Sequence, residues 1–275
     1  MPILKFETHS NYQTILQACI WHKCVNLITA NLKHVAKFGV YIPNSNSHVQ
    51  YYFTSLAVWT ANLPEQLMIA CVAKSASPIS EASMKDFGND ICHTPHTAKV
   101  IINRIYELAK NVNPWDLTHF QKLAKLLFLS RVYLPFWCDW LFSNLYVFLV
   151  LEILHTLDKF FFNHILKWCK EVIGDELNKI FKAQYKHIVA YHFTGGVSYV
   201  KQITKQEHHD IQRTLVTIIA TTPNIDPSFL QAIRAMINFI YQAQSPVYTK
   251  SSIKKMEHAL HEFHDHKHVI VNARA

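Results

Sequence analysis

The sequence has little glycine and lacks the usual marks of secretion, disulfide pairing and phosphate-loop chemistry. Only 5 of its 275 residues are glycine, and no glycine-rich phosphate loop or Gly-x-Ser-x-Gly motif occurs. The 6 cysteines are scattered without a Cys-x-x-Cys pair, which argues against a disulfide scaffold or a zinc ribbon. Lys5, Glu7 and His9 interrupt the N-terminus too early for a signal peptide, and no Asn-x-Ser/Thr sequon is present. We therefore expect an intracellular, unsecreted protein.

The sequence also lacks an apolar run long enough to cross a bilayer. Its most apolar region, 134–154, is interrupted by Pro135, Asp139, Asn144 and Glu152. The uninterrupted part is about half of the roughly 20 residues that a membrane helix needs. We expect a buried core helix in this region and no membrane partner.

The composition is that of a folded, basic protein. Hydrophobic residues make up 50% of the chain and charged residues 17%, so the chain can bury a substantial core. The formal net charge is +8, which favours a polyanionic partner such as DNA. No motif indicates a small-molecule cofactor, and the sequence leaves the oligomeric state open.

The spacing of apolar residues predicts strands only near the N-terminus. Residues 10–37 show helical spacing. Strands are expected at 39–43 and 48–58, with a turn at 44–47 between them, and residues 67–73 suit either a third strand or a short helix.

After a loop at 75–95, almost every segment is predicted to be helical. Asn113 is expected to cap one helix, with Pro114 in its first turn. Later helices are expected at 150–170, 175–188, 205–221, 227–243 and 249–268. The predicted fold class is mainly α (α+β), with a small β-containing part at 1–95 and a large helical part at 96–275.

Charged and polar side chains gather in the segment Glu152–Trp168, at the end of the apolar region. In a helix, Glu152, His155 and Lys159 would share one face at steps of three and four residues. Glu152-x-x-His155 is also the spacing by which one helix supplies two ligands to a metal ion. A ferritin-like two-metal centre needs a second such pair, and none occurs. A structural polar face is the alternative interpretation.

The second half of the chain is basic and carries interspersed aromatic residues. This mixture is typical of a nucleic-acid groove and equally of ordinary helix packing with lysines that extend to solvent. The candidate DNA-binding residues are Lys159, Lys167, Lys201, Lys205 and Arg213.

Several short blocks, taken in order, resemble one protein family. The resemblance covers roughly residues 30–275 and is dense from residue 113 onward. The blocks are similar to those of fungal Plavaka-type transposases, in the Kyakuja–Dileera–Zisupton group of DNA transposons. They include Pro64-Glu65-Gln66-Leu67, Asn113-Pro114-Trp115-Asp116-Leu117, Pro135-Phe136-Trp137-Cys138-Asp139-Trp140, the segment 152–171, His192-Phe193-Thr194, Asp210-Ile211-Gln212, Gln242-Ala243-Gln244-Ser245-Pro246 and Glu262-Phe263-His264-Asp265-His266.

The resemblance implies an RNase H-like core in which three carboxylates hold Mg²⁺ ions for DNA cleavage and strand transfer. The family's middle carboxylate falls on Glu152, with His155 as a weaker metal-ligand candidate. Glutamate in place of the usual aspartate would displace the ligand by about an ångström. Val150-Leu151 replaces a usual Thr-Pro, Asp158 a usual histidine and Asn163 a usual aspartate.

The other two family carboxylates fall outside the matched blocks, one upstream and one downstream. The sequence is therefore expected to be an internal or C-terminal fragment of a transposase, with part of a broken RNase H-like core at 1–95 and helical insertion at 96–275. We expect it to be inactive alone and to hold no Mg²⁺, and to be nuclear if it functions. The alternatives are a basic helical module that binds DNA or protein without catalysis, and a decayed element without function.

Overall fold

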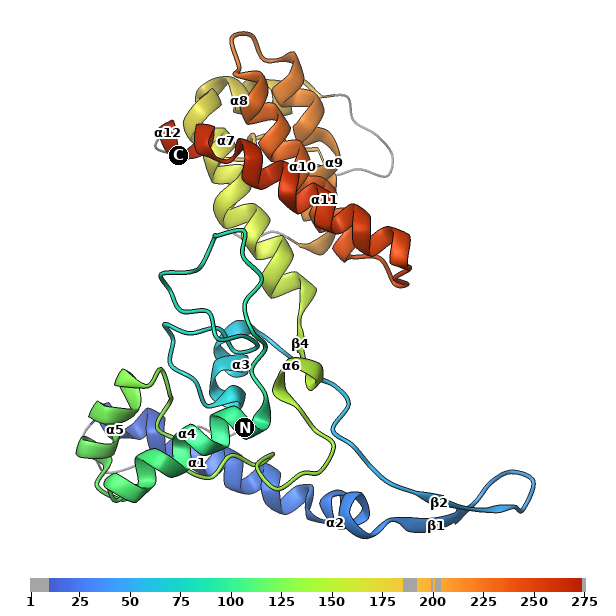
Figure 1. Ribbon diagram of the computed structural model, residues 1–275. Helices are drawn as coiled ribbons and strands as arrows, with labels where there is room; N and C mark the ends of the chain where they lie inside the picture. The colour runs from blue at the N-terminus through green and yellow to red at the C-terminus, as the bar shows by residue number, and fades with distance from the viewer. Residues whose placement is uncertain (1–9, 185–191, 199, 201–203, 274–275) are drawn as a thin grey trace. The chain divides into compact units, whose positions relative to one another are not determined.

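The structure is a computed structural model that describes residues 10–184, 192–198, 200 and 204–273 (Figure 1). The chain divides into two compact units, Met1–Glu152 and Ile153–Ala275. The predicted class is confirmed: the described chain is mainly helical, with two two-stranded sheets. The division of ancestral parts at residue 95 stays a prediction. No helix in the described ranges is both long and apolar enough to span a bilayer.

The first unit contains both small sheets. The predicted helix 10–37 is present but is divided at Thr29. Residues 67–70 belong to a helix that begins at Leu63 and ends at Ala70, and Val72 forms only an isolated β-bridge with Leu129. The elements are α1 (Ser10–Ile28), α2 (Ala30–Phe38), β1 (Val40–Pro43), β2 (Val49–Tyr52), β3 (Trp59–Ala61), α3 (Leu63–Ala70), α4 (Ala98–Asn111), α5 (Leu117–Leu126), α6 (Leu145–Phe148) and β4 (Leu149–Leu151).

Strands β1 and β2 form the predicted antiparallel hairpin, in which Val40 lies opposite Tyr52. Asn44 forms the turn, because its Oδ1 accepts hydrogen bonds from the backbone N–H groups of Asn46 and His48. The second strand ends at Tyr52 and does not reach residue 58 as predicted.

The N-cap of α5 is Asp116, three residues after the predicted cap Asn113. Asn113 Oδ1 accepts a hydrogen bond from the backbone N–H of Trp115, which forms a local turn. Asp116 caps α5 instead, because its Oδ1 accepts from the backbone N–H of His119 at 3.2 Å.

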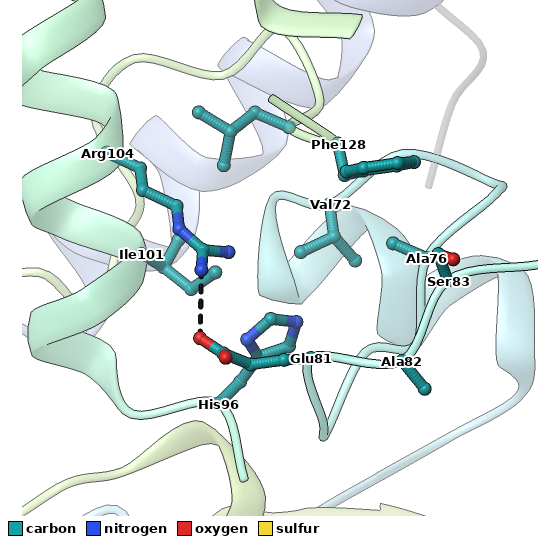
Figure 2. A pocket seen from close by; sticks show the side chains of 10 residues that line it. Val72, Ala76, Glu81, Ala82, Ser83, His96, Ile101, Arg104 and Phe128 are labelled. Carbon is teal, nitrogen blue, oxygen red and sulfur yellow. Dashed lines mark hydrogen bonds and ion pairs between the residues drawn. The ribbon is translucent and has the colours of Figure 1, made fainter. Parts of the chain in front are cut away.

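The predicted loop at 75–95 is present and packs beside α4 (Figure 2). It encloses a cavity of about 30 Å³ next to the ion pair of Arg104 and Glu81, whose atoms lie 2.8 Å apart. Burial, and then the charge of Arg104, lowers the pKa of His96 at the cavity wall. The space suits about one water molecule and is too small for an organic substrate.

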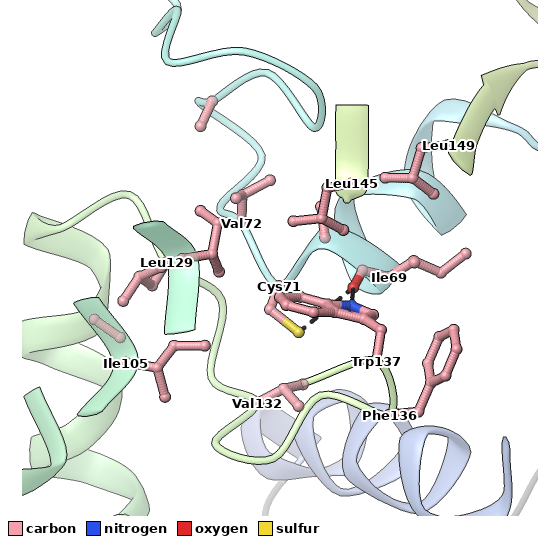
Figure 3. Close-up of a cluster of buried hydrophobic side chains, with 14 of the residues drawn as sticks. Ile69, Cys71, Val72, Ile105, Leu129, Val132, Phe136, Trp137, Leu145 and Leu149 are labelled. Atoms are coloured by element: carbon pink, nitrogen blue, oxygen red, sulfur yellow. Dashed lines mark hydrogen bonds between the residues drawn. The ribbon is translucent and has the colours of Figure 1, made fainter. Parts of the chain in front are cut away.

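The core of the first unit lies between α3, α4 and the segment 129–149 (Figure 3). Trp137 is almost fully buried, and its indole Nε1–H donates to the carbonyl oxygen of Ile69 at 2.6 Å. The prediction of one buried helix at 134–154 is wrong, since this segment consists of turns, the short α6 and β4. Only some of its apolar residues are buried: Trp137, Leu145 and Phe148 pack against distant segments, whereas Leu134, Phe142 and Val147 are exposed.

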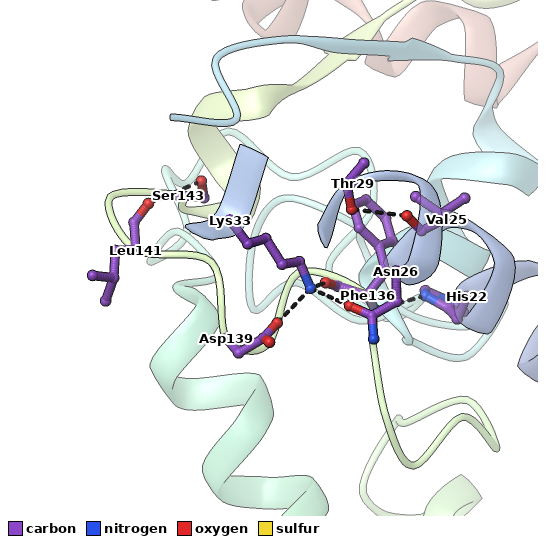
Figure 4. A network of polar contacts seen from close by, with 9 residues as sticks. All are labelled: His22, Val25, Asn26, Thr29, Lys33, Phe136, Asp139, Leu141 and Ser143. Carbon is purple, nitrogen blue, oxygen red and sulfur yellow. Dashed lines mark hydrogen bonds and ion pairs between the residues drawn. The ribbon is translucent and has the colours of Figure 1, made fainter. Parts of the chain in front are cut away.

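Two buried basic side chains tie α1 and α2 to the same segment (Figure 4). The Lys33 ammonium donates to Asn26 Oδ1, to the carbonyl oxygen of Phe136 and to Asp139 Oδ1, the last at 2.5 Å. His22 Nε2 lies 3.1 Å from the carbonyl oxygen of Met68, and His22 Nδ1 accepts from the backbone N–H of Phe136. These contacts fix a neutral imidazole with its proton on Nε2, and burial lowers the pKa of His22 to about 4.

In its described residues the second unit consists of helices joined by turns and short loops, without a strand. Its core is formed by Phe161, Leu166 and Phe181 with apolar side chains of α9 and α10. The predicted starts at Pro227 and after Thr249 are confirmed, because Asp226 and Thr249 cap those helices. The elements are the π-helical turns η1 (Leu154–Asp158) and η2 (Phe161–Ile165), α7 (Leu166–Ile173), α8 (Asp175–Ala183), α9 (Lys205–Thr221), α10 (Pro227–Ala243), α11 (Lys250–His266) and α12 (His268–Asn272).

Candidate active site

The candidate site lies at the carboxyl ends of β3 and β4. These strands are parallel, with Trp59 opposite Leu149 and Ala61 opposite Leu151. Because the carboxyl ends of parallel strands meet at one edge, the residues that follow Ala61 and Leu151 are brought to the same edge. The pairing joins segments about 90 residues apart, and no local pattern in the sequence predicts it.

Gln66 holds this edge together. Its Nε2 donates to the carbonyl oxygens of Ala61 at 2.9 Å and Val150 at 3.0 Å, so that one side chain bridges both strands. Asn62 sets the position of Gln66, because its Oδ1 accepts from the backbone N–H of Glu65 and so begins α3 directly after β3. Gln66 is fully buried, and its Oε1 has no hydrogen-bond partner among the described residues.

Glu152 is the first residue after β4 and is half-buried. It precedes the helical turns, so the predicted helix face shared by Glu152, His155 and Lys159 is not formed. The backbone from 154 to 158 is π-helical, which changes the spacing of side chains around the axis. The side chain of His155 lies outside those that the structure describes, and its role as a metal ligand stays a prediction.

The donors at this edge suit a hard cation in kind but not in number. Carboxylate and amide oxygens, such as those of Glu152 and Gln66, are the ligands that Mg²⁺ prefers. A two-metal centre needs several carboxylates, and the described parts of the chain contain no group of three histidine, cysteine, aspartate or glutamate side chains that could hold a metal ion. The residues described at this edge therefore do not fit the complete Mg²⁺ centre of the resemblance.

The π-helical segment also places a carboxylate in the interior of the second unit. Asp158 is fully buried, and its Oδ1 accepts from Gln212 Nε2 at 3.2 Å and from Gln244 Nε2 at 3.4 Å. Its Oδ2 has no hydrogen-bond partner among the described residues. Burial lowers the pKa of nearby His208, while the charge of Asp158 raises it. Sequence reasoning noted Asp158 as a departure from the family pattern but did not predict its burial.

The structure describes the side chains of three of the five candidate DNA-binding residues, Lys159, Lys167 and Arg213. Lys159 is exposed, and Lys167 Nζ lies 3.4 Å from Glu171 Oε1 on an exposed surface. Arg213 Nη1 lies 3.6 Å from buried Asp210 Oδ1, which engages part of its charge. Lys201 and the side chain of Lys205 lie outside the described residues. Their common role in binding DNA stays a prediction.

Gln66 is the residue of the site that sequence reasoning missed, since it was noted only within the Pro64–Leu67 block. A usable signal was present. Asn62 and Pro64 mark a helix start directly after a β-prone segment, and the first turn of such a helix faces the end of the strand before it.

Comparisons with known proteins give one match. The family model described as Plavaka transposase matches residues 1–169, which is more than half of the chain and includes β3, β4, Gln66 and Glu152. No curated protein and no solved structure matches the chain.

Proposed function

The chain belongs to the Plavaka transposase family and is derived from a transposase, and we propose that its ancestral reaction was metal-dependent DNA cleavage and strand transfer. The proposal gives Glu152 the role of the middle carboxylate of the ancestral metal site. It also assigns the pair of β3 and β4 to a remnant of an RNase H-like sheet, which extends the proposed core beyond the predicted boundary at residue 95, because β4 spans Leu149–Leu151.

The position of Glu152 directly after β4 supports the proposal most strongly. The carboxyl edge of a parallel sheet is where loops commonly place catalytic and ligand-binding side chains. Gln66 fixes the two strand ends there through its hydrogen bonds to Ala61 and Val150. The edge thus has its two strand ends joined by one buried side chain and carries a carboxylate directly after β4.

We further propose that this chain alone does not cut DNA. Two-metal chemistry needs several carboxylates to hold the ions that activate the nucleophile and stabilise the leaving oxygen. Glu152 is the only residue that the family resemblance carries onto this chain as a catalytic carboxylate. One carboxylate cannot position two ions.

Incubation of the purified chain with DNA carrying candidate transposon ends tests this, with Mg²⁺ or Mn²⁺ present. No cleavage above that of Glu152→Gln is expected. Glu107→Gln removes one exposed carboxylate from α4 and is the matched control. The proposed inactivity would be overturned if the wild type and Glu107→Gln cleave the DNA efficiently and Glu152→Gln does not. That result would also establish the catalytic role of Glu152.

The second candidate function is DNA or protein binding without catalysis, in the nucleus. The net charge of +8 and the exposed Lys159 favour it. If this function is correct, the affinity for DNA should fall steeply with salt concentration, because binding releases several counterions. A chain that is never produced, or that does not fold when expressed, would instead indicate a decayed element.

A further inference from the structure

Helices α10 and α11 lie side by side (Figure 1). Their side chains line an open groove of about 330 Å³. Ala259 lies on the groove surface, and its small side chain leaves room there. All the other lining side chains are polar or charged. They are Asn238 and Gln242 from α10, and Ser251, Lys254, Lys255, His258 and Glu262 from α11.

The helical spacing explains why these side chains face one groove. On α11 the lining positions recur at steps of three and four residues, and Asn238 and Gln242 are four residues apart on α10. Thr249 starts α11 with a capping box in which its side chain and that of Ser252 bond each other's backbone N–H groups. The groove is therefore formed by two well-defined helices and not by loops.

The groove carries a net positive charge. Glu262, its one carboxylate, is paired with Arg234 at 2.5 Å, which leaves the charges of Lys254 and Lys255. Both lysines are exposed, and within the described residues neither has a carboxylate within ion-pair distance. Lys250 adds a further exposed cation in the first turn of α11, where the helix dipole also favours anions.

We propose that the α10–α11 groove binds the phosphate backbone of duplex DNA. Lysine ammonium groups, amide N–H groups and serine hydroxyls are the usual partners of phosphate oxygens. The groove has no phenylalanine, tyrosine or tryptophan side chain, the larger rings on which single-stranded bases stack, so a duplex fits it better than a single strand. Contacts of this type read no base sequence, and binding is therefore sequence-independent.

This site differs from the candidates taken from the sequence. Lys159 and Lys167 belong to the segment before α8, and Arg213 on α9 is engaged by Asp210. The groove also lies outside the residues 1–169 that match the family. It rests on its own charge and shape, and it requires no metal and no role for Glu152.

The test is fluorescence anisotropy of the full chain with a short labelled DNA duplex, measured over a series of salt concentrations. Each lysine–phosphate contact contributes about −0.9 to the slope of log K against log salt. The double variant Lys254→Gln/Lys255→Gln should therefore have a slope that is less steep by about 1.8, and it should bind the duplex about tenfold or more weakly. Lys254→Arg/Lys255→Arg keeps both charges and should retain binding.

The matched control is Lys179→Gln/Lys182→Gln on α8, which removes the same charge from the same unit. The proposal is supported if the wild type binds two duplexes of unrelated sequence with equal affinity and only the groove variant binds them more weakly. An equal weakening in the control shows diffuse attraction and overturns it. Absence of DNA binding by the wild type at low salt also overturns it, as does tighter binding to a single strand than to a duplex. Circular dichroism of each variant verifies that the helices are retained.

Discussion

The burial of His22 makes the stability of the first unit dependent on pH. Burial lowers its pKa to about 4 from 6.5, and the Nε2–H and Nδ1 contacts with Met68 and Phe136 require the neutral ring. Above pH 6.5 the ring is neutral in both the folded and the unfolded chain, so this stability is fully present. As the pH falls from 6.5 towards 4, the unfolded chain binds a proton that the folded chain rejects, and stability is lost.

The expected loss follows from the two pKa values. At about 1.4 kcal/mol per pH unit, the full difference between 6.5 and about 4 corresponds to about 3 kcal/mol. Lowering the pH from 6.5 to 5 should remove about 2 kcal/mol of that. His96 and His208 also have pKa values lowered by burial, so the wild-type chain will lose more than His22 alone accounts for.

Urea unfolding of the wild type and His22→Gln at pH 7 and pH 5 isolates the share of His22. Tryptophan fluorescence reports mainly on the first unit, since Trp168 is the only one of the 6 tryptophans beyond residue 152. The variant should be less stable at pH 7, and its deficit should shrink by about 2 kcal/mol at pH 5. His119→Gln, at an exposed position of the same unit, is the control. A deficit that stays constant with pH would refute the neutral, buried imidazole.

Three further substitutions test other parts of the account. Gln66→Ala should destabilise the first unit by about 1–3 kcal/mol in urea unfolding, because the carbonyl oxygens of Ala61 and Val150 lose their shared donor; a neutral effect would contradict the bridging role. Gly39→Ala should lower the free energy of unfolding by about 1 kcal/mol or more, because Gly39 has a φ of +68° and an added Cβ would clash with the Tyr51 ring. Protease cutting within 40–52 should accelerate, whereas Gly88→Ala, also at positive φ but with no atom within 4 Å of the added Cβ, should leave cutting within 40–52 unchanged. Lys33→Met should lower stability by roughly 2 kcal/mol because Asn26 and the Phe136 carbonyl lose their charged donor, while Lys37→Met on the exposed side of α2 should change it little; equal effects would refute the buried network.

The elements that were predicted correctly are those specified by neighbouring residues. Asp226-Pro227 and Thr249 mark the starts of α10 and α11 because a cap and a proline at the first turn act within one helical turn. The hairpin of β1 and β2 was predicted for the same reason, since Asn44 bonds the backbone of its own turn.

The failures concern segments whose structure depends on distant residues. The apolar segment 134–154 is predicted to be one helix. Instead, the Trp137 indole donates a hydrogen bond to the Ile69 carbonyl, and the Phe136 carbonyl accepts one from Lys33, and both partners are distant in the sequence. Hydrophobicity alone indicates that parts of such a segment are buried, and it does not specify which residues are buried or which backbone conformation they adopt. The π-helical turns after Glu152 follow no apolar period that the sequence displays, so the expected helix face was wrong.

The role of Glu152 stays a prediction from family resemblance. The parallel pairing of β3 with β4 and the bridge by Gln66 required the structure. The hydrogen bond from Gln66 Nε2 to the carbonyl oxygen of Val150 joins residues 84 positions apart, and no spacing rule anticipates it.

The central proposal is that Glu152 is the remnant of an ancestral metal site that the described residues do not complete. Isothermal titration of the full chain with Mn²⁺ tests it most directly, with Glu152→Gln and Glu107→Gln measured in parallel. The account predicts one weakly bound ion at most, absent in Glu152→Gln and retained in Glu107→Gln. Tight binding of two ions per chain, dependent on Glu152, would contradict it.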